Sequence, residues 1–88
     1  MRLLNKPIEV IAHYPDKGEP RPLRFRYITE EGSEVVVKIE KILEIRKEKS
    51  PDHGPMLLYR CQSRSDDRVV DFELRFLIDK LKWHLHKA

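Results

Sequence analysis

The fold is decided by residues 72–88, FELRFLIDKLKWHLHKA, which can be read with two periods. With a period near four, five apolar residues line one side of a helix: Leu74, Leu77, Ile78, Leu81 and Leu85. With a period of two, apolar residues alternate with polar ones over 72–76 and again over 81–85, on either side of Asp79 and Lys80. The first pattern predicts a helix, and the second predicts two strands.

Three aromatic rings favour the two strands. A helix would leave Phe72, Phe76 and Trp83 on its solvent side or at its border, whereas two strands turn all three inward. The same inward face then holds Leu74, Leu81 and Leu85. The outward face holds Glu73, Arg75, Lys82, His84 and His86. Because burying a large apolar side chain stabilises a fold by about 1.5–3 kcal/mol, the sequence predicts a hairpin with its loop at 77–80.

Turn-forming residues divide the rest of the chain at 15–20, 30–33, 50–55 and 63–67. The segments between them alternate as strands do, over 7–14, 23–29, 35–39, 56–63 and 70–76. On the second segment the inward row is Leu23, Phe25 and Tyr27. On the fourth it is Leu57, Tyr59 and Cys61. On the fifth it is Val70, Phe72, Leu74 and Phe76.

Residues 38–49, KIEKILEIRKEK, are compatible with a helix or with a bent strand. Three consecutive valines precede this segment, and β-branched side chains lose rotamer freedom in a helix. No capping residue stands directly before Lys38. The alternation slips at Ile42 and Leu43, which is the signature of a β-bulge. We favour the bent strand, and an α+β fold with a helix at 38–49 is the alternative.

These segments predict a single all-β domain over residues 1–88. About six strands joined by short turns form an antiparallel meander, either a strongly twisted sheet or a small, partly open barrel. The 40% of hydrophobic residues can supply one core, and the 38% of charged residues a well-solvated surface. No apolar run is long enough to be a signal peptide or a membrane span. A single cysteine excludes an internal disulfide, so we expect a cytoplasmic protein that does not associate with membranes.

Three motifs in order, PLRFRY at 22–27, YRC at 59–61 and FELRF with KWHLHK within 72–87, resemble a family of bacterial proteins. The family consists of small all-β domains of unknown function, and its members are sometimes encoded beside components of error-prone DNA repair polymerases. The resemblance implies an all-β fold for this chain. It departs from the family after Ile42 and Leu43, where the family tends to carry an aromatic residue and this chain has Glu-Ile-Arg.

Few residues are arranged for catalysis or metal binding. On a strand, His84 and His86 share a face and could both reach one metal ion, but only His13 and His53 remain as further imidazoles. We therefore favour two solvated histidines over a metal site. Cys61 has no cysteine partner and is predicted to be a small buried residue. With its carboxylates scattered in turns and no glycine-rich phosphate loop, the sequence indicates a non-enzymatic protein without a cofactor.

Basic side chains suggest the one alternative function. Arg24 and Arg26 share the outward face of their strand, and Lys82, with Arg75, lies on the outward face of the last hairpin. If the sheet brought these four together, they would form a surface that follows phosphates. The net charge of +3 is modest, however, and a solvated polar face explains the pattern equally simply. The sequence favours a protein-interaction module that binds a protein partner or itself, with accessory nucleic-acid binding as the alternative.

Overall fold

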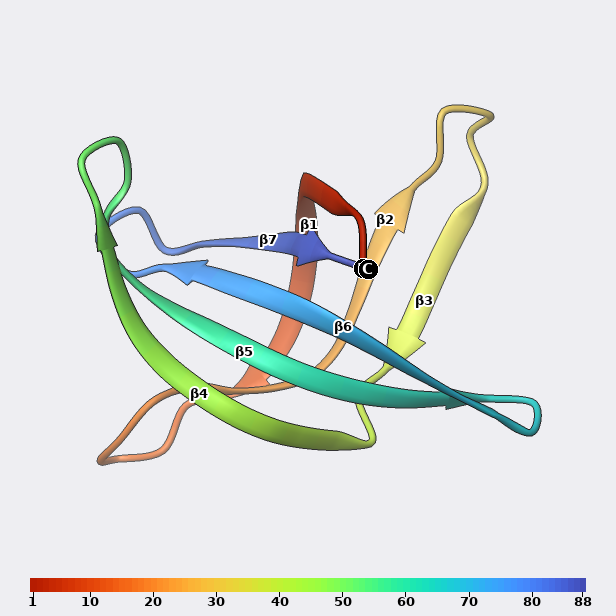
Figure 1. Ribbon diagram of the computed structural model, residues 1–88, viewed down its shortest axis with the longest axis horizontal. Helices are drawn as coiled ribbons and strands as arrows, with labels where there is room; N and C mark the ends of the chain where they lie inside the picture. Colours follow the sequence, from red (N-terminus) through yellow and green to blue (C-terminus); the bar gives the residue numbers. More distant parts are fainter.

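The computed structural model describes all 88 residues as seven antiparallel strands without a helix (Figure 1). The strands are β1 (Leu3–His13), β2 (Arg21–Ile28), β3 (Glu34–Lys38), β4 (Lys41–Ser50), β5 (Gly54–Ser65), β6 (Arg68–Leu77) and β7 (Lys82–Lys87). The all-β antiparallel prediction is confirmed, with seven strands rather than six. No helix has the length and apolarity that are needed to cross a lipid bilayer.

The strands form one open sheet in the order β3-β2-β1-β7-β6-β5-β4. Two meanders, β1 to β3 and β4 to β7, are joined because the first and last strands pair in the middle of the sheet. The strand order departs from chain order at one place: β3 and β4 are consecutive in the chain but lie at opposite edges. Only Ile39 and Glu40 connect them, so the sheet must bend until its two edges approach each other at that point.

The core lies on the inner face of this bend. Phe25 on β2 packs against Phe72 on β6 with ring centroids 5.5 Å apart, although β1 and β7 separate these two strands in the sheet. The sheet therefore curls around one cluster of nine buried residues: Phe25, Leu57, Tyr59, Cys61, Phe72, Leu74, Phe76, Trp83 and Leu85. Trp83 is 7% exposed, and its ring lies 4.6 Å from that of Phe76 and 5.3 Å from that of Tyr59. The predicted hairpin and its buried tryptophan are confirmed.

The ambiguous segment at 38–49 is a strand, β4. Its pairing with β5 shifts between Ile42 and Glu44, so Leu43 is the extra residue of a bulge and is exposed. The bulge prediction is confirmed, and the helix alternative is wrong. The long pairing with β5, from Lys41 to Ser50, satisfies the backbone groups on one side of β4.

Three residues expected in the core are exposed, two of them because a turn or a bulge shifts the alternation. Leu81 is 74% exposed and has a φ of 55°, since the hairpin loop comprises 78–81 rather than 77–80. Leu23 is exposed and Pro22 is buried in its place, because the β1–β2 register shifts between Ile11 and Ala12. Val70 is also exposed, since β6 extends past the core at that end.

The outer face of β7 is more covered than the sequence predicts. His86 is 9% exposed, and His84 and Arg75 are half-buried. The pairing of β1 with β7 is irregular between Leu3 and Lys6, and this irregularity carries Asn5 onto His86. His86 is covered by Asn5, which lies 81 positions earlier in the chain. Alternation within residues 82–87 cannot predict a contact with so distant a strand.

Candidate binding site at an open sheet edge

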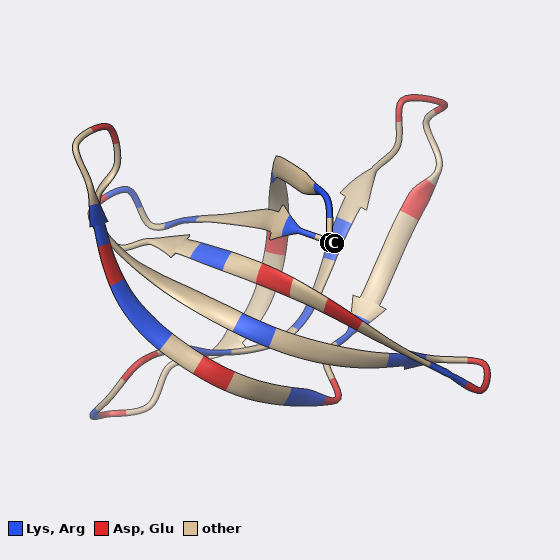
Figure 2. Ribbon diagram, in the orientation of Figure 1, with Lys and Arg blue, Asp and Glu red and all other residues tan.

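The four basic residues expected to form a phosphate-binding face do not form one cationic surface. Arg26 on β2 is held between Glu9 and Glu34, with a 2.8 Å contact to each carboxylate. Arg75 on β6 donates to His86 Nε2 at 3.2 Å. Only Arg24 and Lys82 are exposed and without an ion-pair partner, and they lie on β2 and β7, which β1 separates. In Figure 2 acidic positions interrupt the basic ones on several strands, and the strands that carry basic positions alone, β2, β5 and β7, are not neighbours in the sheet.

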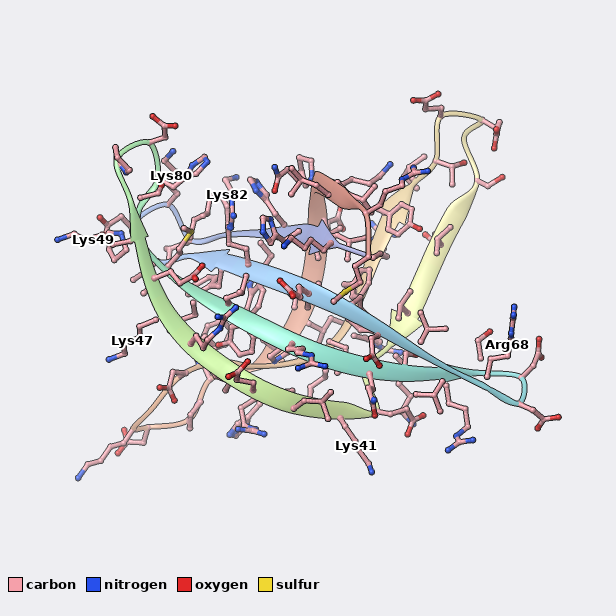
Figure 3. The ribbon with its side chains drawn as sticks, viewed as in Figure 1. Lys41, Lys47, Lys49, Arg68, Lys80 and Lys82 are labelled. Atoms are coloured by element: carbon pink, nitrogen blue, oxygen red, sulfur yellow. The ribbon has the colours of Figure 1, made fainter.

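The basic side chains labelled in Figure 3 are also spread over the molecule. Figure 3 shows Lys47 and Lys49 along β4, and Lys80 and Lys82 beside the start of β7. Lys41 and Arg68 lie well away from these four (Figure 3). None of the six forms an ion pair within the chain. A polyanion therefore meets scattered charges rather than one continuous track.

The two histidines considered as metal ligands have different environments. His86 Nδ1 lies 2.7 Å from Asn5 Oδ1, and its Nε2 accepts from Arg75, so both ring nitrogens are engaged and the ring is neutral. Burial, and then the Arg75 charge, lower the pKa of His86. Burial likewise lowers the pKa of His84, whose ring lies 6.4 Å from that of His53. No group of three or more His, Cys, Asp or Glu side chains is arranged to hold a metal ion.

The β4 edge of the sheet is protected against pairing with another chain. Lys47 lies opposite Leu57, and Lys49 opposite Pro55, so both lysines are on the core-facing side of the strand. Lysines on the core-facing side of an edge strand and a bulge are two of the devices by which natural sheets prevent their edges from accepting a further strand, and here both lysines reach solvent. Both devices are present on β4.

The β3 edge has neither device. Ile39 N–H donates to Leu23 O at 2.9 Å, and Thr29 N–H donates to Ser33 O at 2.8 Å. The β2–β3 register is regular between these two bonds. The backbone N–H and C=O groups of the odd-numbered residues of β3 therefore point to β2, and those of the even-numbered residues point away from it. The backbone groups of Glu34, Val36 and Lys38 therefore point to the free edge, where Lys38 O alone has a partner, Ser63 Oγ at 2.7 Å.

An apolar cavity of about 510 Å³ lies beside this edge, between β3 and the β5–β6 hairpin. Figure 1 shows the hairpin running past the Lys38 end of β3. Nine of the 13 lining residues are hydrophobic. The apolar side chains include Phe25, Tyr27, Val35, Val37, Val70 and Phe72. The charged side chains are Lys38 and Arg64, and neither forms an ion pair.

The sequence contains a signal for this edge, but its meaning depends on topology. A run of three valines between Glu34 and Lys38 predicts a strand, and a single meander would place that strand in the interior of the sheet. Only the strand order shows that β3 is an edge. The exposure of Val70 has the same origin, since Val70 lines the cavity that an unclosed sheet leaves open.

Comparison with protein-family models, with curated proteins and with solved structures found no match. The family resemblance described above therefore stays an expectation. The sheet edge, the cavity and the charges around them are the features of the molecule that indicate a function.

Proposed function

We propose that the protein is a non-enzymatic interaction domain that binds an extended polypeptide segment as an additional strand on β3. One observation carries this proposal: β3 is an edge strand with neither a bulge nor a core-facing lysine, whereas the edge strand at the other end of the sheet has both. A row of unpaired backbone groups is a template for strand addition, which is a recurring mode of peptide recognition.

The β3 edge and the cavity supply the two components of such binding. The backbone groups of Glu34 and Val36, with Lys38 N–H, can bond to the main chain of the incoming strand. Alternate side chains of that strand point toward the core side of the sheet, where the apolar cavity lies. Main-chain bonds give affinity, and the cavity selects for apolar side chains.

The one cysteine of the chain does not support a catalytic function. Cys61 is fully buried in the core, and burial raises the pKa of its thiol to about 12. A thiol with that pKa carries almost no thiolate at neutral pH, and the thiolate is the reactive form. The surroundings of Cys61 are those of a packing residue.

The proposal is tested by selecting a random displayed peptide library on the immobilised protein. We expect enrichment of peptides with alternating apolar residues, and loss of their binding in Val36→Pro. Because Val36 N–H points to the free edge, proline removes a donor that the isolated domain does not use and leaves the β2–β3 ladder intact. Circular dichroism checks that the variant remains folded.

Leu43→Ala is the matched control, because Leu43 is an exposed apolar residue of the opposite edge strand. It should bind the selected peptides as the unmodified protein does. Failure to enrich any peptide contradicts the proposal. So does a set of peptides that binds Val36→Pro and the unmodified protein equally well.

A further inference from the structure

We infer that β3 of one molecule pairs with β3 of a second copy, antiparallel about a twofold axis at Val36. This inference rests on the proposed function and names its partner. The sequence of β3 is Glu-Val-Val-Val-Lys, in which opposite charges stand at equal distances from the central Val36. An antiparallel pair centred there puts Glu34 opposite Lys38 of the second copy, twice in each dimer.

The backbone groups fit the same register. The residues whose groups face the free edge are Glu34, Val36 and Lys38, which are symmetric about the centre. In an antiparallel ladder, two directly opposed residues whose groups face each other exchange both N–H···O bonds. Val36 therefore pairs with itself across the axis, and Glu34 pairs with Lys38. Lys38 O already accepts from Ser63 Oγ, so the N–H of Glu34 in the second copy must share or replace that contact.

The side chains of this register are also complementary. On the outward face, Arg26 of β2 lies opposite Val36 of β3 and forms an ion pair with Glu34 of the same strand, β3. Val36 is 55% exposed, so pairing covers an apolar side chain with its own symmetry mate. A centre shifted by one residue would bring Glu34 opposite Val36 and lose both charge pairs. The charge pattern thus selects one register.

Sedimentation equilibrium or light scattering on the untagged protein tests the inference over about 10 µM to 1 mM, because a short edge gives a weak dimer. We expect the mass to rise from 10.6 kDa toward twice that value. Glu34→Lys and Lys38→Glu should each weaken association by about tenfold, because two attractive cross-strand pairs become repulsive. The double variant with both changes restores opposite charges across the axis and should recover the original dimerisation.

The recovery distinguishes this register from other dimers. Glu48→Lys and Lys47→Glu make the same charge changes on β4 and should leave association unchanged. A protein that is monomeric at every concentration overturns the inference, as does a dimer that survives both single changes or Val36→Pro. If the displayed peptides bind an obligate monomer, the proposed function stands and the second copy is excluded. If dimers form in the stated register and no peptide is enriched, self-association is the function of the edge.

Discussion

The side chain of Trp83 is held between two other rings of the core, those of Phe76 and Tyr59. Trp83→Ala should lower the free energy of unfolding by about 3–5 kcal/mol, the usual range for truncating a buried aromatic residue. A small domain has about 5–10 kcal/mol in total, so the variant should be close to unfolding. Urea denaturation followed by circular dichroism measures the loss.

His84→Ala is the control for this change, because the neighbouring side chain lies on the other face of β7. The ring is half-buried and its Nδ1 has no hydrogen-bond partner, so its removal should change the melting temperature far less than removal of Trp83 does. A larger effect of His84→Ala than of Trp83→Ala would mean that the register of β7 is wrong by one residue.

The environment of His86 predicts a stability that depends on pH. Burial, followed by the charge of Arg75, lowers the pKa of His86 from 6.5. The remaining charged groups acting on the ring are Glu73, Lys87 and Glu48. As the pH falls below 6.5, the unfolded chain takes up a proton that the folded ring still refuses, so the free energy of unfolding decreases. Well above pH 6.5 His86 is neutral in both the folded and the unfolded chain, so this loss of stability is absent.

Urea denaturation at about pH 7.5 and about pH 5 measures this decrease, and comparison with His86→Gln isolates the contribution of His86. Glutamine cannot titrate, so the variant should lose less stability between the two conditions than the unmodified protein. The pKa of His84 is lowered as well, and part of the dependence therefore remains in the variant. An equal loss in both proteins would contradict the assignment to His86.

Alternation along the chain predicted the burial of single residues wherever the strand is regular. Cys61 and Trp83 fall on the inward face as expected, because β5 pairs with β6 without a shift and the pairing of β6 with β7 is regular from Leu74 to Leu77. Leu23 and Leu81 do not, since one lies at a bulge and the other has a positive φ in a turn. His86 was misjudged for a different reason: its cover, Asn5, comes from the far end of the chain.

The strand β4 shows how much the local sequence can determine about one element. The valine run and the slip at Ile42 and Leu43 were sufficient to predict a bulged strand instead of a helix. The same local reading predicted β3 as a strand but could not show that it is an edge. Edge position depends on which strands pair, and the deciding pair here is β1 with β7, from opposite ends of the sequence.

The two lysines on the core-facing side of β4, Lys47 and Lys49, are predicted to keep that edge free of other chains. Replacing both Lys47 and Lys49 with valine makes the edge apolar on its core-facing side and removes the charge that must be desolvated when another strand docks. We expect large, concentration-dependent assemblies instead of a defined dimer, measured by light scattering. Lys41→Val, at the start of the same strand, is the single-charge control. Unchanged scattering from the double variant would show that these lysines do not protect the edge.

The strand order is the part of the fold that local patterns in the sequence do not predict. Turn residues predicted most of the short connections, and each hairpin followed from the two strands that flank its turn. In the β1–β7 pairing, Ile8 lies opposite Trp83, which is more than 70 positions away in the chain. No local sequence pattern in either strand predicts this pairing. The interaction edge and its cavity both follow from that pairing, so the candidate site was out of reach of the sequence pattern.

The distribution of charge over the whole molecule predicts weak and unspecific binding to nucleic acid. Arg26 is neutralised by two carboxylates and Arg75 is bonded to His86, so the four residues of the hypothetical phosphate face cannot act together. Arg24→Glu and Lys47→Glu change the net charge equally at two exposed sites, of which Arg24 belongs to that face and Lys47 does not. Both should therefore weaken retention of a labelled oligonucleotide to the same small extent at about 50 mM salt, where phosphate contacts are strongest.

Neither variant nor the unmodified protein should bind measurably at about 150 mM salt, because scattered cations neutralise few phosphates at once and salt weakens each of these ion pairs. Filter binding or fluorescence anisotropy across the salt series measures both effects. Weaker retention in Arg24→Glu alone, together with retention that persists at the higher salt, would overturn this prediction. It would show that the β2 side of the sheet is a nucleic-acid surface in spite of the two carboxylates that hold Arg26.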